Sequence, residues 1–378
     1  MYMTTILRNL ITLVLLLIAT GSTPLATSMM AQSSNATDQG TLVKATDARF
    51  AYTGRIHFNN DGGACWTWPG AQITCQFKGT EATMKTKPGC GYWVVVVDGG
   101  QPRKVESTKE NNGVVTLASH LSNEKHLLQL TYATEAVVRR PVFYGLMLGK
   151  NGTLCDKPQL PTRKMEFIGN SITCALGNEW DGTSKDYKMS MQNIYYSYEA
   201  ITARNLQARY QVVARSGLGI YRNTCGNVNG DKNVLPTYYP YADFGTSGAL
   251  WDFSQYQPDV VCVNLGTNDT TSPSWSDEKL QEAFKAFVKT LRSHYPKAKI
   301  VLLTGTMIKN KRLTAVQQAQ QAAIDDAAKR GDKEVYRFDF TPDDGSLGWG
   351  YGRHPSRKRH EQMAAELTPY LQKLMNWN

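Results

Sequence analysis

The chain has 378 residues, a length that predicts about two domains. Lysine and arginine total 42 against 32 aspartates and glutamates, which gives a formal net charge of +10. The basic residues are scattered, with short clusters only at residues 309–312 and 357–359. We therefore set a nucleic-acid partner aside and interpret the charge as a basic surface suited to an anionic envelope or acidic glycans.

Residues 1–31 are typical of a secretory signal peptide. Arg8 is the one charge in this stretch, and a short apolar run and several small residues follow it. Cleavage fits after Ser28 or after Ala31, and loss of Arg8 leaves a net charge of 10 − 1 = +9. The apolar run is too short and too early to favour a membrane span. The first cysteine is Cys65, which argues against a lipid anchor. We expect an exported protein, periplasmic or extracellular, with no membrane anchor after cleavage.

Seven cysteines follow the leader, and their spacing matches no zinc pattern. Export permits disulfides, and an odd number leaves at least one cysteine unpaired within the monomer. Cys262 lies inside an apolar strand and is expected to be a core residue. Cys65, Cys75 and Cys90 are close enough in sequence to pair with one another, but the pattern does not decide the connectivity.

Residues 45–155 consist of short strand candidates separated by Gly, Pro and Asn turns, without a long helical period. This spacing predicts an all-β sandwich or jelly roll. The strand candidates are residues 50–58, 71–77, 80–86, 92–97, 114–118, 126–132 and 143–148.

Several large aromatic residues fall in this first region, among them Trp66, Trp68, Tyr92 and Trp93. Stacking on carbohydrate is one interpretation, but large aromatics in a sandwich more often fill the core, and we favour the core. Two roles remain open for the region. It is either a separate glycan-binding module or a rigid support that completes one wall of an active site.

Residues 158–378 follow a short linker that contains Pro158 and Pro161, and here apolar runs alternate with helical patterns. Apolar residues at helical spacing predict a helix after Ser276, another over about 313–330 and a last one at the end of the chain. Such alternation predicts a three-layer α/β/α domain around a parallel sheet of about five strands. The strand candidates are residues 164–168, 210–214, 260–265, 300–304 and 335–340.

The first of these strands ends at Gly169 and is followed directly by Asn170 and Ser171. Ligands of open α/β sheets bind beyond the carboxyl ends of the strands, so a serine on this turn presents its hydroxyl where a substrate would lie. Gly-Asn-Ser is also ordinary turn chemistry. The assignment of Ser171 as a nucleophile therefore depends on three later loops.

Each of these loops follows a strand candidate or precedes the last helix. Glycines in the first loop, Gly217 and Gly219, allow backbone N–H groups to approach a ligand oxygen closely. The second loop carries Asn268, whose amide is a suitable oxyanion donor. In the third, His354 precedes a proline that keeps its backbone out of the helical region, and this histidine can serve as a base. Together the loops supply a nucleophile, a base and oxyanion donors.

In the order Ser171, Gly217, Asn268 and His354, these residues resemble the motif residues of the SGNH (GDSL-like) hydrolase superfamily. More narrowly, residues 167–179, with the sequence FIGNSITCALGNE, look like the first block of carbohydrate esterase family 2. That family also carries an N-terminal jelly roll, and its first domain is similar to residues 52–55, 66–70 and 97–99 of this chain. The resemblance covers nearly all of the mature sequence.

Two departures from the superfamily pattern affect the expected site. The usual Gly-Asp-Ser reads Gly-Asn-Ser here, so we expect Asn170 to change the support of the turn rather than the chemistry. The acidic residue that commonly precedes the histidine is replaced by Tyr351 or Gly352. We therefore expect a Ser–His dyad in which a backbone carbonyl orients the histidine. A distant carboxylate is the alternative, with three candidates: Asp339, Asp343 and Asp344.

The resemblance implies acyl transfer without a metal or cofactor. Ser171 attacks an ester with His354 as base, and the oxyanion is held by the N–H groups of Ser171 and Gly217 and the amide of Asn268. Gly219 is the alternative backbone donor. The implied substrates are acetylated plant polysaccharides such as xylan or mannan, or their oligosaccharides. Three aromatic residues are weaker candidates for stacking on sugar rings: Trp275, Trp349 and Tyr351.

We therefore predict a secreted carbohydrate O-acetyl esterase. One alternative is an esterase or thioesterase on the same scaffold that acts on lipid or aryl esters, and a preference for longer acyl chains would identify it. The other is a catalytically silent glycan-binding protein, for which the missing carboxylate is the argument. The sequence indicates no particular oligomeric state.

Overall fold

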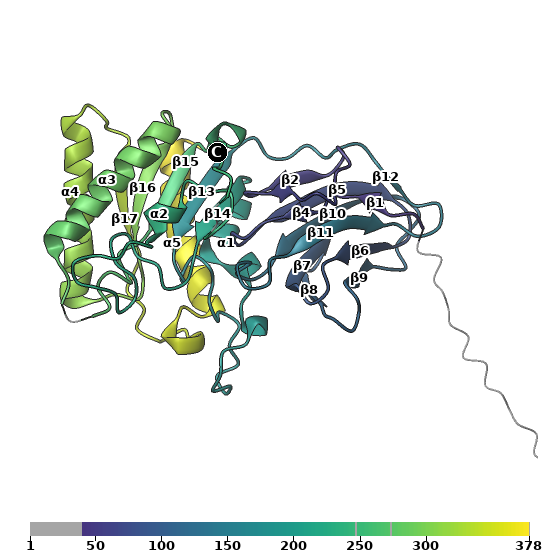
Figure 1. Cartoon of the computed structure of the whole chain (residues 1–378), viewed down its shortest axis with the longest axis horizontal. Coiled ribbons are helices and arrows are strands. Elements are labelled where there is room, and N and C mark those ends of the chain that lie inside the picture. Colours follow the sequence, from purple (N-terminus) through teal and green to yellow (C-terminus); the bar gives the residue numbers. More distant parts are fainter. Residues whose placement is uncertain (1–39, 246–247, 273, 378) are drawn as a thin grey trace, which may run out of the picture. The chain divides into compact units, whose positions relative to one another are not determined.

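The structure is a computed structural model that describes residues 40–245, 248–272 and 274–377, and these described residues belong to one compact unit. The predicted signal peptide lies outside the described residues. Within the described ranges, no helix is both long and apolar enough to cross a membrane. The predicted fold class is confirmed: antiparallel sheets occupy the N-terminal region, and a parallel five-stranded sheet with helices follows (Figure 1).

Two six-stranded antiparallel sheets make up the N-terminal region. The first runs in the order β3-β4-β11-β6-β9, with β1 beside β11. Its strands are β1 (Val43–Lys44), β3 (His57–Phe58), β4 (Ala64–Cys65), β6 (Ala82–Thr86), β9 (Val114–Ala118) and β11 (Val142–Met147). The second runs in the order β12-β5-β10-β7-β8, with β2 beside β5. Its strands are β2 (Ala51–Thr53), β5 (Gln72–Lys78), β7 (Gly91–Val97), β8 (Arg103–Ser107), β10 (Lys125–Tyr132) and β12 (Thr153–Leu154).

Three of the four large aromatics of this region are core residues, as predicted: Trp66, Trp68 and Trp93. Trp66 and Trp93 are buried between the sheets, where their rings meet edge to face with centroids 5.4 Å apart. Trp68 is buried as well, but it packs into the core of the following α/β region. Tyr92 is partly buried on a smaller cluster.

The strand expected over residues 50–58 is broken into β2 and β3. The break falls at Gly54, whose backbone φ of 120° is rarely adopted by residues other than glycine. The next residue, Arg55, leaves the sandwich and is buried against the second region. A single continuous strand was therefore wrong, because this turn redirects the chain.

The C-terminal region has a parallel sheet in the order β14-β13-β15-β16-β17. The strands are β13 (Lys164–Gly169), β14 (Arg209–Ala214), β15 (Val260–Asn264), β16 (Lys299–Thr304) and β17 (Val335–Asp339). The α-helices are α1 (Tyr198–Asn205), α2 (Leu235–Tyr238), α3 (Asp277–His294), α4 (Asn310–Lys329) and α5 (Arg357–Met375). Short 3₁₀ turns are η1 (Met189–Met191), η2 (Ile194–Tyr196), η3 (Phe253–Gln255) and η4 (Tyr351–Arg353).

Alternate residues of the parallel strands enter two separate cores, which gives the three predicted layers. On β13, Ile168 packs into the core that contains α3 and α4, whereas Phe167 packs into the core that contains α1 and α5. As predicted, Ser276 caps α3 by accepting a hydrogen bond from the N–H of Lys279. Because the strands are parallel, their carboxyl ends share one edge, where the loops of the candidate site begin.

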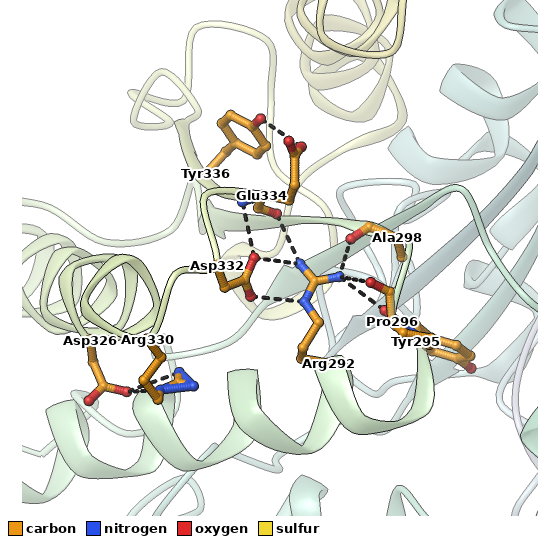
Figure 2. A network of polar contacts seen from close by, with 9 residues as sticks. All are labelled: Arg292, Tyr295, Pro296, Ala298, Asp326, Arg330, Asp332, Glu334 and Tyr336. Atoms are coloured by element: carbon orange, nitrogen blue, oxygen red, sulfur yellow. Dashed lines mark hydrogen bonds and ion pairs between the residues drawn. The ribbon is translucent and has the colours of Figure 1, made fainter.

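The opposite, amino-terminal edge of the sheet is held by Arg292 of α3 (Figure 2). Its guanidinium donates to both carboxylate oxygens of Asp332 at 2.8 and 3.1 Å, and to the carbonyl of Ala298 at 2.6 Å. Asp332 and Ala298 precede β17 and β16, so one side chain fixes the entry of two strands. These contacts lie at the end of the sheet opposite the predicted catalytic loops, so they stabilise the fold and do not shape the candidate site.

All seven described cysteines are free thiols. Cys262 is fully buried in β15, as predicted. The local pairing allowed for Cys65, Cys75 and Cys90 is not formed. Cys65 and Cys75 lie on strands of different sheets, and Cys90 is buried beside the hydroxyl of Thr86, 3.2 Å away.

Candidate active site

The predicted nucleophile, Ser171, lies on a tight turn directly after β13. A β-carbon at Gly169 would come within 2.1 Å of the Thr173 hydroxyl, so glycine is what lets the chain turn here. Asn170 is buried, and its side-chain oxygen accepts the backbone N–H of Ile172 at 3.1 Å. The asparagine in place of the usual aspartate therefore supports the turn.

His354 connects the predicted nucleophile to a backbone carbonyl. Its Nε2 lies 2.8 Å from the Oγ of Ser171, and its Nδ1 lies 3.0 Å from the carbonyl oxygen of Tyr351. A carbonyl oxygen only accepts hydrogen bonds, so in the neutral ring Nδ1 carries the proton. Nε2 is then free to accept the serine hydroxyl proton. This is the tautomer that a general base requires.

Local contacts fix the loop that carries the histidine. His354 has extended backbone angles (φ −71°, ψ 165°), as the following proline predicts. The N–H of Tyr351 donates to the carbonyl of Gly177 at 3.0 Å, which ties this loop to the turn after Ser171.

The three carboxylates considered as distant partners of His354 point elsewhere. Asp343 accepts from the N–H of Gly345 at 3.0 Å and Asp344 from that of Ser346 at 2.9 Å. Asp339 lies 3.3 Å from the Nε of Arg337. Within the described part of the chain, none of these carboxylates contacts the histidine.

The surroundings of His354 set its basicity. Burial lowers the pKa of this imidazole below its ordinary value of 6.5, because a charged ring loses solvation. The hydrogen bond to the Tyr351 carbonyl and the negative charge of Glu135 raise the pKa and oppose this effect. The neutral ring is therefore the resting form at neutral pH.

Two of the predicted oxyanion donors have no partner among the described residues: the backbone N–H groups of Ser171 and Gly217. Gly217 has φ of 84°, a conformation that favours glycine. The alternative donor, the N–H of Gly219, is already bonded to the side chain of Asn223 at 3.2 Å. Asn268 donates one amide hydrogen to the carbonyl of Leu218 at 2.6 Å and accepts the hydroxyl of Thr224 at 2.7 Å.

A cavity of about 360 Å³ brings these residues together. Among the described residues that line it, Arg312 carries the one permanently charged side chain. Its guanidinium donates to the carbonyl of Thr267 at 3.1 Å. The complete lining is Ser171, Leu176, Ser216, Gly217, Thr224, Thr267, Asn268, Thr271, Met307, Arg312 and His354. The four motif residues predicted from the sequence thus share one cavity.

Comparison with known sequences decides the family. Residues 52–158 match the N-terminal model of carbohydrate esterase 2, and residues 167–362 match the GDSL-like lipase/acylhydrolase family. A family two carbohydrate esterase from Clostridium thermocellum, solved in complex with cellohexaose, is 36% identical with a TM-score of 0.80. The alignment covers 87% of this chain and 100% of that one. The chain belongs to carbohydrate esterase family 2. The predicted resemblance is confirmed.

Other known proteins resemble the chain over most of its length. The cellulase/esterase CelE of Acetivibrio thermocellus is 36% identical over 86% of this chain, which spans 39% of that longer protein. An acetylxylan esterase/glucomannan deacetylase of Cellvibrio japonicus is 28% identical, with 89% of this chain and 91% of that protein aligned. A solved family two esterase from the same organism has a TM-score of 0.79 and 25% identity, over 89% of this chain and 98% of that one.

The three aromatic candidates for sugar stacking do not line the cavity that contains Ser171 and His354. The indole N–H of Trp275 donates to Asp277 at 2.7 Å, and Trp349 is 37% exposed. Tyr351 turns its hydroxyl to the carbonyl of Lys185, 3.1 Å away, although its own carbonyl serves His354. Contact of these three side chains with substrate stays a prediction.

Sequence reasoning missed two carboxylates that shape this family 2 site. Asp269 is fully buried, and its Oδ1 accepts the N–H groups of Ile220 and Tyr221, both at 2.9 Å. Its position beside Asn268 was the available signal. Glu135 comes from the N-terminal region and contacts the loop before Gly217, and nothing in its sequence surroundings indicated this. In the described ranges, no three His, Cys, Asp or Glu residues gather in a way that could hold a metal ion.

Proposed function

We propose that this chain is an exported serine esterase that removes O-acetyl groups from acetylated plant polysaccharides or their oligosaccharides. The observation that carries the proposal is the line from the Ser171 hydroxyl through the His354 ring to the Tyr351 carbonyl, at 2.8 and 3.0 Å. A relative named acetylxylan esterase/glucomannan deacetylase supports the choice of substrate. The leader-like residues 1–31 support export.

The proposed reaction proceeds in two steps. His354 Nε2 takes the proton of the Ser171 hydroxyl while Oγ forms a bond to the acetyl carbonyl carbon. The carbonyl oxygen becomes an oxyanion, for which the N–H groups of Ser171 and Gly217 and the amide of Asn268 are the donors. Collapse expels the sugar oxygen, which receives the proton from His354. Water, activated by the same histidine, then cleaves the acyl-enzyme and releases acetate.

A backbone carbonyl replaces the carboxylate of a triad in this scheme. It performs one of the tasks of a carboxylate, because it holds the imidazole in the required tautomer and orientation. It carries no full charge, so it stabilises the imidazolium less. The proposed catalytic unit is therefore a Ser171–His354 dyad.

The proposal is tested by acetate release from acetylated xylan and acetylated glucomannan. We expect release by the parent and loss of release in Ser171→Ala and His354→Ala, with both variants still folded. A series of 4-nitrophenyl esters with lengthening acyl chains should show a preference for acetyl. Retained binding to the polysaccharides without acetate release would contradict the proposal, and a preference for long chains would favour a lipid or aryl esterase instead.

A further inference from the structure

Glu135 reaches from the N-terminal sandwich into the catalytic loop of the α/β region. It lies in the loop between β10 and β11, and its side chain is buried. One carboxylate oxygen accepts the N–H of Ser216 at 2.9 Å and a guanidinium N–H of Arg215 at 2.6 Å. The other oxygen accepts the Ser216 hydroxyl at 2.6 Å. The two carboxylate oxygens together thus accept hydrogen bonds from two consecutive residues of one loop, Arg215 and Ser216.

These contacts fix the peptide that carries a predicted oxyanion donor. Ser216 is held through its backbone N–H and through its hydroxyl, and the next N–H along the chain is that of Gly217. A β-carbon at Gly217 would meet no atom within 4 Å, so side-chain packing does not hold this residue, although its carbonyl accepts the N–H of Thr224 at 2.9 Å. The Gly217 N–H belongs to the peptide bond that joins it to the anchored Ser216, so the Glu135 contacts help to set the direction in which this N–H points. An oxyanion donor is effective only when it is fixed before the reaction.

The loop that carries Glu135 is itself held from both sides. The N–H of Glu135 donates to the side-chain oxygen of Gln192 at 3.2 Å, and the carbonyl of Ala133 accepts the N–H of Ile194 at 2.9 Å. Gln192 also donates to the carbonyl of Cys174, three residues after the nucleophile, at 2.5 Å. Gln192 thus links the loop that carries the Glu135 carboxylate to the turn that carries Ser171.

The charge of Glu135 also acts on the catalytic histidine. It raises the pKa of His354 against the lowering effect of burial. Other charged or titratable groups near this ring include Arg353 beside it in the chain, Arg215, which is paired with Glu135, Arg312 across the cavity, and buried His360 on α5. Among these groups, Glu135 is the one with a negative charge that can favour the imidazolium.

We propose that Glu135 is a positioning residue through which the N-terminal sandwich holds Gly217 in its oxyanion-binding conformation and stabilises the imidazolium of His354. The inference rests on the proposed esterase function and deepens it. It assigns to the sandwich a part in catalysis that a detachable glycan-binding module would not have. It also identifies a source of negative charge in a site whose histidine is oriented by a carbonyl.

The test compares Glu135→Gln and Glu135→Asp with the parent in hydrolysis of 4-nitrophenyl acetate across pH. Glutamine keeps the size of the side chain but loses the charge, so kcat should fall by about 10- to 100-fold with little change in KM. The acid limb of the kcat/KM profile should move to lower pH, because the His354 pKa falls. Aspartate keeps the negative charge, so the acid limb of the kcat/KM profile should stay in place. Its side chain is too short to make both contacts with Ser216, so kcat should fall.

Glu179→Gln is the matched control. Glu179 also pairs with a residue of the sandwich, Lys104, at 2.7 Å, but it does not contact the loop before Gly217. Its removal should leave the acid limb where it is in the parent. Ser216→Ala removes the hydrogen bond from the Ser216 hydroxyl to Glu135 and leaves the charge of Glu135 in place. This variant should lower kcat, and it can be measured even if Glu135→Gln fails to fold.

An active parent whose acid limb is the same in Glu135→Gln would overturn this proposal alone. If Glu135→Gln does not fold, unchanged kcat in Ser216→Ala and Glu135→Asp would overturn it. Absence of hydrolysis by the parent would overturn the esterase function, and this proposal with it. The parent's own rate therefore separates the two failures.

Discussion

The guanidinium of Arg55 lies 3.4 Å from the carboxylate of Glu166, and neither side chain is exposed to solvent. Arg55 follows β2 of the sandwich, and Glu166 lies in the centre of β13. The carboxylate also accepts the hydroxyl of Tyr239 at 2.7 Å and the amide of Gln211 at 2.6 Å. A buried ion pair with these additional hydrogen bonds thus joins the first region to the strand that precedes the proposed nucleophile, Ser171.

Arg55→Ala is expected to destabilise the protein by about 3–5 kcal/mol, because it leaves the buried Glu166 carboxylate without its countercharge. Equilibrium unfolding in urea, followed by intrinsic fluorescence, measures this loss. The double variant Arg55→Met with Glu166→Met removes both charges and should lose less stability than Arg55→Ala. A double variant that loses more would show that the pair itself stabilises the fold.

Asn268→Ala tests the oxyanion site. Loss of one preorganised donor typically lowers turnover by about 10²–10³-fold, because the donor binds the oxyanion more strongly than the ground-state carbonyl. We therefore expect a fall of this size in kcat with a small change in KM. Steady-state kinetics on 4-nitrophenyl acetate provides both values. An unchanged kcat would remove Asn268 from the proposed mechanism.

The pH dependence of the parent enzyme follows from the environment of His354. The base must be neutral, and burial lowers the pKa of this ring below 6.5. The neutral form therefore persists at moderately acidic pH, and the midpoint of the acid limb of kcat/KM should lie below 6.5. A pH–rate profile measures the midpoint. A midpoint above 6.5 would mean that a full negative charge dominates the surroundings of the ring.

Stability at acidic pH should report on a second histidine, His360 on α5. Burial lowers the pKa of His360 to about 3, and its Nδ1 accepts the N–H of Tyr198 at 3.1 Å. The unfolded chain takes up this proton below about 6.5, whereas the folded protein does so only near 3. The stabilising effect is therefore complete above pH 6.5 and is lost as the pH falls toward 3, by at most about 1.4 kcal/mol per pH unit.

His360→Gln isolates this contribution, since glutamine can accept the same N–H without titrating. Unfolding free energies measured from pH 7 to pH 4 should fall less steeply in the variant than in the parent. His126→Gln is the control with the opposite sign: Asp98 raises the pKa of His126, so the contribution of this histidine is complete below about pH 6.5 and is lost as the pH rises above that value. Equal slopes in the parent and His360→Gln would contradict the assignment.

Much of the site could be predicted from the sequence because its residues follow strand ends. Ser171 and Asn268 lie two and four residues after the ends of buried apolar strands, and parallel strands bring those positions to one edge. A backbone carbonyl as the partner of His354 was also predicted, because the positions that usually hold an acidic residue are occupied here by Tyr351 and Gly352. These predictions need only strand order and local turn chemistry.

Contacts between the two regions could not be predicted in the same way. Glu135 and Arg215 are 80 residues apart, and Arg55 and Glu166 are 111 apart. No periodicity links such positions, because the contacts depend on how the sandwich packs against the sheet. The expected continuous strand over residues 50–58 was wrong, because Gly54 turns the chain and Arg55 then contacts the second region rather than continuing the strand.

The central claim is that the Ser171 hydroxyl is a nucleophile activated by His354. Its most direct test is covalent labelling with diethyl 4-nitrophenyl phosphate, followed by mass spectrometry of the digested protein. The account predicts that one diethylphosphoryl group appears on the peptide containing Ser171 as 4-nitrophenolate is released, and that labelling is lost in Ser171→Ala and much slower in His354→Ala. Acetate release by a parent enzyme whose Ser171 is never labelled, or labelling at another residue, would contradict it.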